Sequence, residues 1–525
     1  MNSTKKMLLV TFIGSTFALP ALAATYYVAP SGASVSGSAD GSATNPFASL
    51  DAAFQSGRIA AGDTIVLKNG KHAGLKINGR SFSSPVTIKA ETKGGVTTEY
   101  VQVTGSSSNV IVADLNVWPS NPYSSPVGSL VSAAAGSSKI VFSGMDIRAG
   151  QDAGNYPSWS ASEWNNRRVN GIQINSTASR AENNKITGVT FGINADAADA
   201  LVVGNTVDGF SADGMRANSD RVTLRGNTIK NCVQIDANHA DGIQSFTLDI
   251  NNPMSNITLD GNVVLEWANP TVSPHRCQLQ GIGFFDGFYD DLVIRNNIVA
   301  VSAYHGITVM GGRRAKIVNN TVVNIKGAVT NYPWIDLSAH KNGTPSTDSV
   351  VANNIAMKFN GTSSTSNRTT FSDNTVIGDP KQLFENWAAF DYRPKSASGY
   401  IDSANVAYAP ATDVYGNARP FGSGPDKGAI EVGSSGGSSG GTTDGSSGGT
   451  SSGGTTSGGG TSSGGGTTSG GGTTSGGGTT SGGGTATNGG TTTGGGTATN
   501  GGSTTNPGPK WVKPRKKKYR RSYSG

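Results

Sequence analysis

Histidine, arginine and aspartate side chains gather in the middle of the chain, each next to or shortly after a glycine-containing phrase. The set is Asp213, Arg216, His239, Asp241 and His305. Histidine can transfer protons near neutral pH, arginine can neutralise an anion, and a carboxyl group can hold a proton or a cation. We therefore take His239, His305, Arg216 and Asp241 as candidate catalytic residues for acid–base chemistry.

The elements that must position these side chains are indicated by a repeat. A phrase of asparagine followed by apolar or β-branched residues returns at intervals of 20 to 23 residues in some turns and 34 or 35 in others. The asparagines are Asn184, Asn205, Asn227, Asn262, Asn297, Asn320, Asn354 and Asn374. A second phrase, glycine followed by an apolar residue, runs in step with the first at Gly171, Gly192, Gly214, Gly242, Gly281 and Gly306.

Short β-branched segments separated by asparagine and glycine turns, at such a period, are typical of stacked coils. The pattern predicts an all-β fold, a parallel β-helix, in which each strand lies about 4.8 Å from its equivalent in the next coil. We expect the asparagines to adopt left-handed turn geometry and to bond one another from coil to coil, which is a structural role.

The same register sorts polar residues onto one sheet face. The residue before each glycine of the second phrase forms one predicted column: Asn170, Phe191, Asp213, Asp241, Gln280 and His305. Polar residues on a solvated sheet face are the plainer interpretation of any single member. The concentration of Asp, Asp, Gln and His in the central coils favours a functional groove there.

Asp213 and Asp241 are predicted one coil apart. Like charges at that distance raise one pKa or recruit a cation, and carboxylate oxygens suit calcium. We therefore expect Asp213 and Asp241 to be calcium ligands, if a metal is used at all. Further residues of the region are assigned to substrate binding: Gln244, Gln280, Arg276, Tyr304 and Trp267.

Both ends of the body resemble a known family. The segments are Tyr26 to Gly32, Asn45 to Phe47 and Ala61 to Leu67 at the start, and Asp413 to Pro420 and Asp426 to Ala429 at the end. They look like the entry and closing segments of right-handed parallel β-helix proteins of the pectate-lyase-like superfamily. The resemblance covers roughly residues 24–432. It implies a capping helix at Leu50 to Ser56 and a first strand at Thr64 to Leu67.

The resemblance also bears on the reaction, because this superfamily includes polysaccharide lyases, glycoside hydrolases, uronate epimerases and non-enzymatic adhesins. The stretch from Ala212-Asp213-Gly214 to Ala240-Asp241-Gly242 is similar to the calcium-binding stretch of one pectate lyase family, although Ala240 stands where that family has a second aspartate.

We expect an enzyme, a lyase that cleaves an acidic, uronate-containing polysaccharide by β-elimination. The alternatives are a hydrolase using Asp213 and Asp241, or Asp241 and Asp286, and a uronate C5-epimerase. A non-catalytic surface adhesin or matrix-binding protein is the alternative from another class. No specific nucleic acid is expected as a partner, and the protein is expected to be a monomer.

The ends of the chain differ from its body. Lys5 and Lys6, the apolar run to Leu19 and the small residues of Ala21-Leu22-Ala23 predict a cleavable signal peptide over residues 1–23. The chain is thus expected to be secreted, periplasmic or bound at the cell surface, with no transmembrane span.

The body of residues 24–432 is followed by a Gly/Ser/Thr-rich stretch at 433–506, predicted to be a flexible linker, and by a basic tail at 507–525. The tail accounts for most of the formal net charge of +7. We expect the tail to bind an anionic cell surface or polysaccharide.

Cys232 and Cys277 are the only cysteines. A disulfide and two separate buried thiols remain equally good interpretations of them.

Overall fold

The computed structural model describes residues 23–35, 37–247, 249–327, 332–361 and 366–433. The chain divides into a unit of residues 1–442 and one of residues 443–525. The second unit, the predicted signal segment up to residue 22, and the linker and tail beyond residue 433 lie outside the described residues. A bilayer-spanning helix is absent from the part of the chain that the structure describes.

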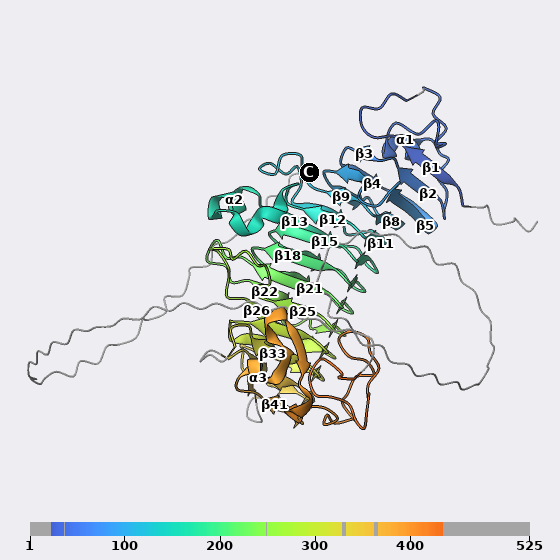
Figure 1. Ribbon diagram of the computed structural model, residues 1–525. Helices are drawn as coiled ribbons and strands as arrows, with labels where there is room; N and C mark the ends of the chain where they lie inside the picture. Colours follow the sequence, from blue (N-terminus) through green and yellow to red (C-terminus); the bar gives the residue numbers. More distant parts are fainter. Residues whose placement is uncertain (1–22, 36, 248, 328–331, 362–365, 434–525) are drawn as a thin grey trace, which may run out of the picture. The chain divides into compact units, whose positions relative to one another are not determined.

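The described body is a stack of coils, each built from strands of three parallel sheets (Figure 1). Sheet A contains β1 (Thr25–Val28), β2 (Thr64–Leu67), β5 (Ser81–Ala90), β8 (Ser108–Ala113), β11 (Ser138–Ser143), β14 (Arg180–Glu182), β17 (Leu201–Val203), β20 (Thr223–Arg225), β24 (Thr258–Asp260), β28 (Val293–Arg295), β32 (Lys316–Val318), β36 (Val350–Ala352) and β40 (Thr370–Ser372). Sheet B contains β3 (Gly70–Lys71), β6 (Val96–Thr98), β9 (Asn116–Val117), β12 (Asp146–Arg148), β15 (Lys185–Val189), β18 (Thr206–Phe210), β21 (Thr228–Cys232), β25 (Val263–Leu265), β29 (Ile298–Val301), β33 (Thr321–Asn324), β37 (Ile355–Ala356) and β41 (Thr375–Val376).

Sheet C, which carries the predicted site, completes each coil. It contains β4 (Leu75–Asn78), β7 (Val101–Thr104), β10 (Ser129–Ala133), β13 (Asn170–Ile174), β16 (Ile193–Ala195), β19 (Met215–Ala217), β22 (Asp241–Phe246), β26 (Gln280–Asp286), β30 (His305–Met310), β34 (Trp334–Ser338) and β38 (Lys358–Asn360). From β22 onward a smaller sheet lies between sheets C and A: β23 (Met254–Ser255), β27 (Tyr289–Asp290), β31 (Gly312–Arg313), β35 (Ser346–Thr347) and β39 (Ser366–Asn367).

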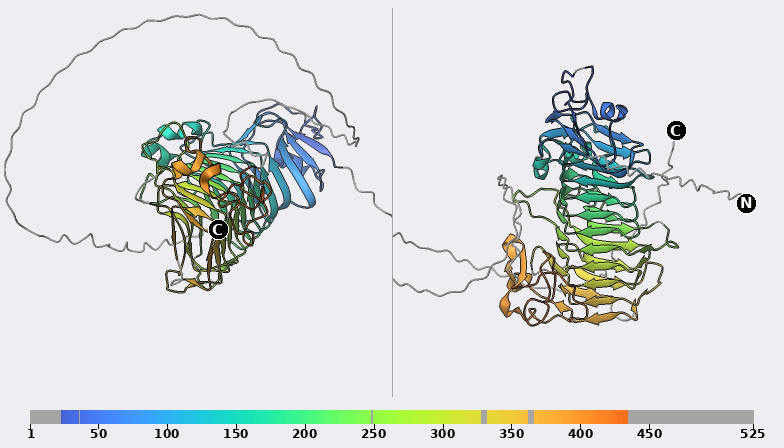
Figure 2. Two further views of the ribbon diagram at one scale, coloured as in Figure 1. Left: turned by 60° about the horizontal axis from the view of Figure 1, so that its bottom comes forward. Right: turned by 90° about the vertical axis from the view of Figure 1, so that its right-hand side faces the viewer.

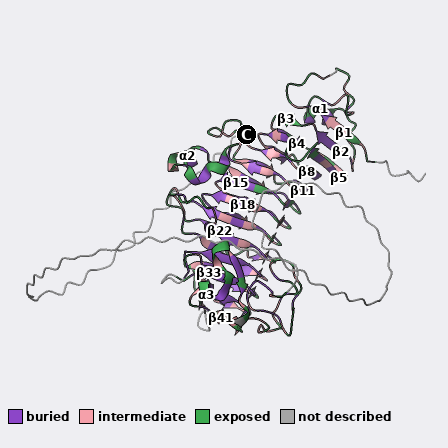
Figure 3. Ribbon diagram, viewed as in Figure 1, coloured by how far each residue is buried: buried purple, intermediate pink, exposed green. Residues whose placement is uncertain are grey.

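The coils are held in register by inward apolar side chains and by buried turns. Inward residues alternate with outward ones along strands such as β8 and β11, whereas β29 and β33 are buried throughout, and Figure 3 shows the buried positions running through the stack. One core cluster extends from Val28 to Ala356 through the interior of the stack. The right-hand view of Figure 2 shows the coils lying one on another.

The asparagine column is confirmed as a hydrogen-bonded ladder. Asn262, which is fully buried, accepts at Oδ1 from the backbone N–H of Asn227 at 3.1 Å and from its Nδ2 at 2.9 Å, and donates from Nδ2 to Oδ1 of Asn297 at 3.0 Å. The left-handed geometry, however, lies one residue earlier than predicted, as at Gly261 and Asn296. The preceding residue makes the turn, which leaves the ladder asparagine free to aim its amide along the stack.

The glycine column marks a close approach of backbone at the start of sheet C. A Cβ atom added at Gly242 would lie 2.8 Å from the carbonyl oxygen of Gly281, in the next coil. Any larger residue would therefore push neighbouring coils apart, which explains why glycine recurs in step with the asparagines.

Both predicted end features are present in modified form. Helix α1 (Leu50–Gln55), N-capped by Ser49, places Leu50, Ala53 and Phe54 against the end of the core, as the capping-helix prediction required. Thr64–Leu67 is a strand, but it is the second one, because Thr25–Val28 pairs outside it in parallel register.

Outside the coils, the helical elements are η1 (Ala153–Ser158), α2 (Ala161–Asn166), α3 (Pro380–Leu383), η2 (Trp387–Ala389) and η3 (Ser396–Ser398). The hairpin of β42 (Phe384–Asn386) and β43 (Asp391–Pro394) belongs to a C-terminal segment that packs on the outside of sheet B in a second apolar cluster. In the right-hand view of Figure 2 this segment stands beside the coils, away from sheet C.

Candidate functional site

The outer column of sheet C lines up as the sequence register predicts. The backbone bonds Gly192 N–H to Asp213 O, at 3.1 Å, and Gly214 N–H to Asp241 O, at 2.9 Å, place these residues on successive coils. Asp241 then pairs with Gln280, and His305 with Trp334, in parallel register. The register slips at Gly306, and this extra residue brings His305 beside Trp334. Such irregularities re-aim side chains, often next to functional sites.

Asp213 is buried and already has a cationic partner. Arg216 donates from Nε to its Oδ2 at 2.7 Å, and the backbone N–H of Asp241 donates to its Oδ1 at 3.1 Å. The guanidinium group lies over the rings of Phe191 and Phe246, with its Cζ 4.1 and 5.3 Å from their centroids. Burial raises the pKa of Asp213, while Arg216 acts in the opposite direction.

Asp241 is fully buried beside Asp213 and has one unsatisfied oxygen. Gln244 donates from Nε2 to Oδ2 of Asp241 at 2.8 Å, but Oδ1 has no hydrogen-bond partner among the described residues. The Oε1 atom of Gln280, its strand neighbour, is also buried without a described partner. Burial, and then the charge of Asp213, raise the pKa of Asp241 well above its ordinary value. Because Arg216 stabilises the charge on Asp213, we assign the proton of the pair to Asp241.

This donor set fits the predicted calcium poorly. Asp213 and Asp241 supply two carboxyl groups, one of them paired with Arg216, whose charge would repel a cation. Within the described residues, no three His, Cys, Asp or Glu side chains are grouped so that they could hold a metal ion. The chemistry considered below therefore uses no metal, and calcium at Asp213 and Asp241 stays a prediction.

His305 lies in an aromatic cluster further along the same face. Its ring is 4.9 Å from Phe285, 4.3 Å from Tyr304 and 5.3 Å from Trp334, measured between centroids. Its Nδ1 shares a hydrogen bond of 2.8 Å with Oγ1 of Thr308, which also accepts from the indole N–H of Trp334 at 3.0 Å. Tyr304 is 44% exposed, so the cluster presents an open aromatic surface.

The surroundings of His305 keep its imidazole neutral. Burial, followed by the charges of His239 and Lys341, lowers its pKa to about 4. His239 is exposed, and it lies near enough to Asp213 and His305 for a charge on it to act on both. Lys341, which donates to Asp286 at 2.7 Å, and Lys358, whose Nζ lies 5.4 Å from the centroid of the Trp334 ring, are the lysines close to the aromatic cluster.

Asp336 and Trp334 belong to the site but were missed by the sequence reasoning. Asp336 pairs with Thr308 in sheet C, is 7% exposed, and has an Oδ1 without a described partner. The glycine-apolar phrase stops at Gly306, and Pro333-Trp334-Ile335 takes its place in the next coil. Extending the register from His305 across this interruption would have found both residues.

Replacing Asp336 with asparagine is expected to stabilise the fold at neutral pH but not in acid. Burial raises the pKa of Asp336 from 3.8 to about 6. The protonated form stabilises the folded state below pH 3.8, and this contribution is lost as the pH rises through 6. An asparagine amide does not ionise, so the variant avoids this loss of folding free energy. From the size of the pKa shift, the loss is about 3 kcal/mol at pH 8.

The measurement is the midpoint of thermal unfolding for the wild-type protein and for Asp336→Asn, at pH 4 and pH 8. The exposed Asp249→Asn is the matched control, with no change expected at either pH. An equal shift of the Asp336→Asn midpoint at both pH values would show that the carboxyl group is not held neutral.

Two residues assigned to substrate binding are engaged elsewhere. Arg276 donates from Nη2 to Oε1 of the fully buried Glu266 at 2.7 Å. Trp267 is 4% exposed, its ring lies 6.4 Å from that of Tyr156, and its N–H donates to the carbonyl of Asn269 at 2.9 Å. Both belong to the connection between β25 and β26. The disulfide Cys232–Cys277 ties this connection to β21, which settles the cysteine alternatives.

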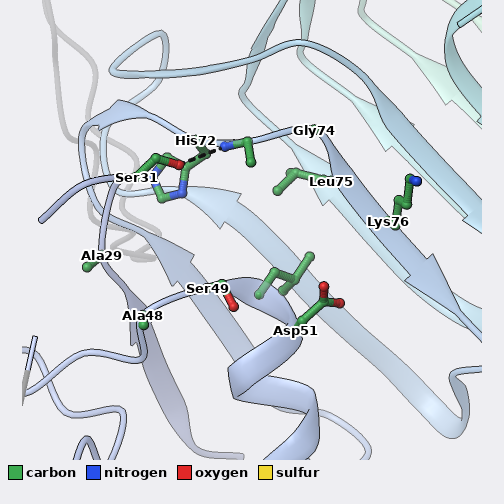
Figure 4. Close-up of a pocket in the computed structure, with 11 residues that line it drawn as sticks. Ala29, Ser31, Ala48, Ser49, Asp51, His72, Gly74, Leu75 and Lys76 are labelled. Carbon is green, nitrogen blue, oxygen red and sulfur yellow. Dashed lines mark hydrogen bonds between the residues drawn. The ribbon is translucent and has the colours of Figure 1, made fainter. Parts of the chain in front are cut away.

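The small pocket in Figure 4 lies at the other end of the molecule, beside α1. It measures about 80 Å³, and its histidine, His72, is buried with Nε2 bonded at 2.8 Å to the carbonyl of Lys68. Ser31 accepts from the backbone N–H of Ala73, as the dashed line shows. These residues serve the packing of the N-terminal coil.

Comparison with known proteins bears on the fold. Residues 170–391 match the family model described as "Right handed beta helix region". No curated protein matches the chain. Among solved structures, the chain is similar to pectate lyase Pel9A, at 14% identity over 78% of this chain and 96% of that chain, with a TM-score of 0.42.

Two further solved structures are named as enzymes of other kinds, an epimerase and a biosidase. The mannuronan C-5 epimerase AlgE4 A-module of Azotobacter vinelandii is 16% identical over 63% of this chain and 90% of that chain, with a TM-score of 0.41. The GH136 lacto-N-biosidase from Eubacterium ramulus is 11% identical over 67% of this chain and 68% of that chain, with a TM-score of 0.38. We draw no inference about the reaction from similarities this low.

The family match covers the coils that carry the candidate site, and the three sheets continue in parallel register on both sides of it. The described body of this chain therefore folds as a parallel β-helix, and its residues 170–391 match the right-handed β-helix family.

Proposed function

We propose that this protein is a polysaccharide lyase that cleaves an acidic, uronate-containing glycan by β-elimination on the outer face of sheet C. The observation that carries the proposal is the neutral imidazole of His305, held by Thr308 at Nδ1 within an open aromatic cluster, with His239 and Lys341 near enough to act on it. A lyase of this kind needs a base, an acid and a positive charge for the uronate carboxylate.

In this proposal His305 is the base. With its Nδ1–H donated to Thr308, the lone pair of Nε2 accepts the proton from C5 of the uronate. The electron pair of the C5–H bond forms the C4–C5 double bond as the bond from C4 to the glycosidic oxygen breaks. A bound carboxylate raises the pKa of His305 from its low value, which strengthens the base once substrate is present.

Tyr304 is the proposed acid, because its ring lies against that of His305 and is 44% exposed. Its O–H delivers a proton to the leaving glycosidic oxygen. His239 and Lys341 are assigned to the uronate carboxylate, since both lie close enough to act on His305, and the substrate carboxylate would take the place of Asp286 as the partner of Lys341. Arg216, Asp213 and Asp241 form the second cluster of the face, and Gln244 and Gln280 stand beside Asp241.

The burial of the carboxyl groups argues against hydrolysis. A hydrolase needs two carboxyl groups that reach the glycosidic bond and a water molecule. Asp213 and Asp241 are 2% and 0% exposed, and Asp213 is paired with Arg216. Asp286 is exposed, but Lys341 pairs with it at 2.7 Å.

The test uses the full-length protein with polygalacturonate, alginate, hyaluronan and heparan sulfate, each with and without chelator. Ultraviolet absorbance of unsaturated uronate and new reducing ends are followed in parallel. Both signals together support a lyase, and their loss with chelator would restore the calcium prediction at Asp213 and Asp241. Reducing ends alone indicate a hydrolase. A changed sugar configuration by NMR, without cleavage, indicates a C5-epimerase, and binding alone indicates an adhesin.

A further inference from the structure

A deep cleft opens near the N-terminal end of the stack, on the side of sheet B. It has a volume of about 1050 Å³, which is ample for a bound oligosaccharide. The cleft forms where the connections leading into sheet C change in length. Those after β3 and β6 are short, whereas the connection between β9 and β10 and the one carrying η1 and α2 are long. In Figure 1, β3, β9 and β12 follow one another beside this region, with α2 next to β13.

Two aromatic residues from the connection between β9 and β10 line the cleft, and an arginine lies against each of them. The Cζ of Arg148 lies 5.4 Å from the centroid of the Trp118 ring. The Cζ of Arg167 lies 4.9 Å from the centroid of Tyr123, and its Nη2 donates to the tyrosine hydroxyl at 3.1 Å. An arginine thus lies against each ring, while Tyr123 remains 55% exposed.

The arginine under Tyr123 belongs to a buried charge network. Arg167 is 5% exposed, donates to Asp152 at 2.6 and 2.9 Å and to Glu163 at 3.0 Å, and packs on Trp159. Its Nε is buried with no hydrogen-bond partner among the described residues. Tyr123, in contrast, is 55% exposed. Burying a charge is costly unless it is paired, and the bonds to Asp152 and Glu163 provide that pairing, so the guanidinium is fixed against the exposed ring.

The other residues that line the cleft carry polar groups that can form hydrogen bonds with a ligand. Thr97, Glu99 and Gln151 line the cleft, and Lys71 donates from Nζ to Oγ of Ser120 at 2.7 Å. The charged residues of the lining are Lys71 and Arg167, which are positive, and Glu99 and Asp152, which are negative. The cleft therefore has no net formal charge.

We propose that this cleft is a second glycan-binding site, for an uncharged pyranose segment. Aromatic faces suit the apolar C–H face of a pyranose ring, and the polar perimeter suits its hydroxyl groups. The balanced charge of the lining suits a ligand without charge. The two sites are about 29 Å apart along the stack, since six strand spacings separate β10 from β30 in sheet C. The site thus binds without sharing residues with the proposed reaction.

The experiment titrates the full-length protein with cellohexaose, mannohexaose, xylohexaose and maltohexaose, each followed by intrinsic fluorescence and calorimetry. We expect at least one hexasaccharide to bind with an affinity that is the same at 50 and 500 mM NaCl, because no charge is involved. Trp118→Ala and Tyr123→Ala are each expected to weaken this binding at least fivefold.

Phe421→Ala, at an aromatic residue that is 49% exposed elsewhere on the protein, is the matched control and should bind as the wild type does. His305→Gln should also bind normally, so failure of the lyase proposal leaves this test intact. If the Trp118→Ala variant does not fold, the Tyr123→Ala variant still tests the proposal, because Tyr123 is exposed. Absence of binding by all four hexasaccharides, or unchanged binding by a folded Tyr123→Ala variant, would overturn the proposal.

Discussion

Replacing His305 with glutamine is expected to reduce cleavage of the acidic polysaccharide at least about 100-fold, because general base catalysis contributes on that scale. Glutamine can still bond to Thr308 but has no basic nitrogen for the C5 proton. The measurement is the initial rate of unsaturated uronate formation on the polymer that gives the largest signal. The midpoint of thermal unfolding should change little, since the ring is at the outer face.

His275→Gln is the matched control, because His275 lies on the connection between β25 and β26 and not in sheet C. Its rate should equal that of the wild type. A His305→Gln variant that keeps a tenth or more of the wild-type rate would exclude His305 as the base and direct attention to His239.

The pH dependence gives an independent check on the same residue. With a pKa of about 4 in the free protein, His305 is neutral, and able to accept a proton, above that pH. We expect kcat/KM to fall in acid with a midpoint near 4, and kcat to fall at a higher pH because the bound carboxylate stabilises the imidazolium form. Profiles without an acid limb above pH 3 would contradict this assignment.

Replacing Asn262 with alanine is expected to destabilise the central coils by about 3 kcal/mol or more. The change removes the oxygen that accepts from the backbone N–H and from Nδ2 of Asn227. The buried N–H then has no partner, and Nδ2 keeps only its bond to the carbonyl of Val202, at 3.0 Å. Each such loss costs about 1–3 kcal/mol. It also removes the donor to the carbonyl of Leu224 at 2.9 Å.

This effect is measured by the midpoint of thermal unfolding and by hydrogen exchange of β21, β25 and β29. Exchange should accelerate there first, because a stacked repeat is stabilised mainly by neighbouring coils. Asn251→Ala, at an exposed asparagine outside the ladder, should change neither quantity. Uniform protection in the Asn262→Ala variant would mean that the ladder contributes little.

The two clusters of the site differ in how far the sequence predicts them. Asp213, Asp241, Gln280 and His305 can be placed in one column because each stands directly before a glycine of the recurring glycine-apolar phrase. Trp334 and Asp336 follow an insertion that interrupts the spacing, so only the paired strands β30 and β34 reveal them. The ion pair between Arg276 and Glu266 likewise could not be predicted from the sequence, because it depends on how the connection between β25 and β26 folds back.

The capping helix was predicted from the resemblance of the chain's ends to a known family. The sequence by itself determined the parallel coils, the asparagine ladder and the face on which the polar residues gather. These features follow from local repetition, because each coil contacts mainly its neighbours and the same residue types recur at the same positions. Only the tertiary structure decided which polar side chains are available for chemistry. Burial keeps Asp241 protonated, and Arg216 pairs with Asp213. The cleft beside Trp118 exists only because connections of unequal length lie side by side. That relation between coils is not encoded in the periodicity of the sequence.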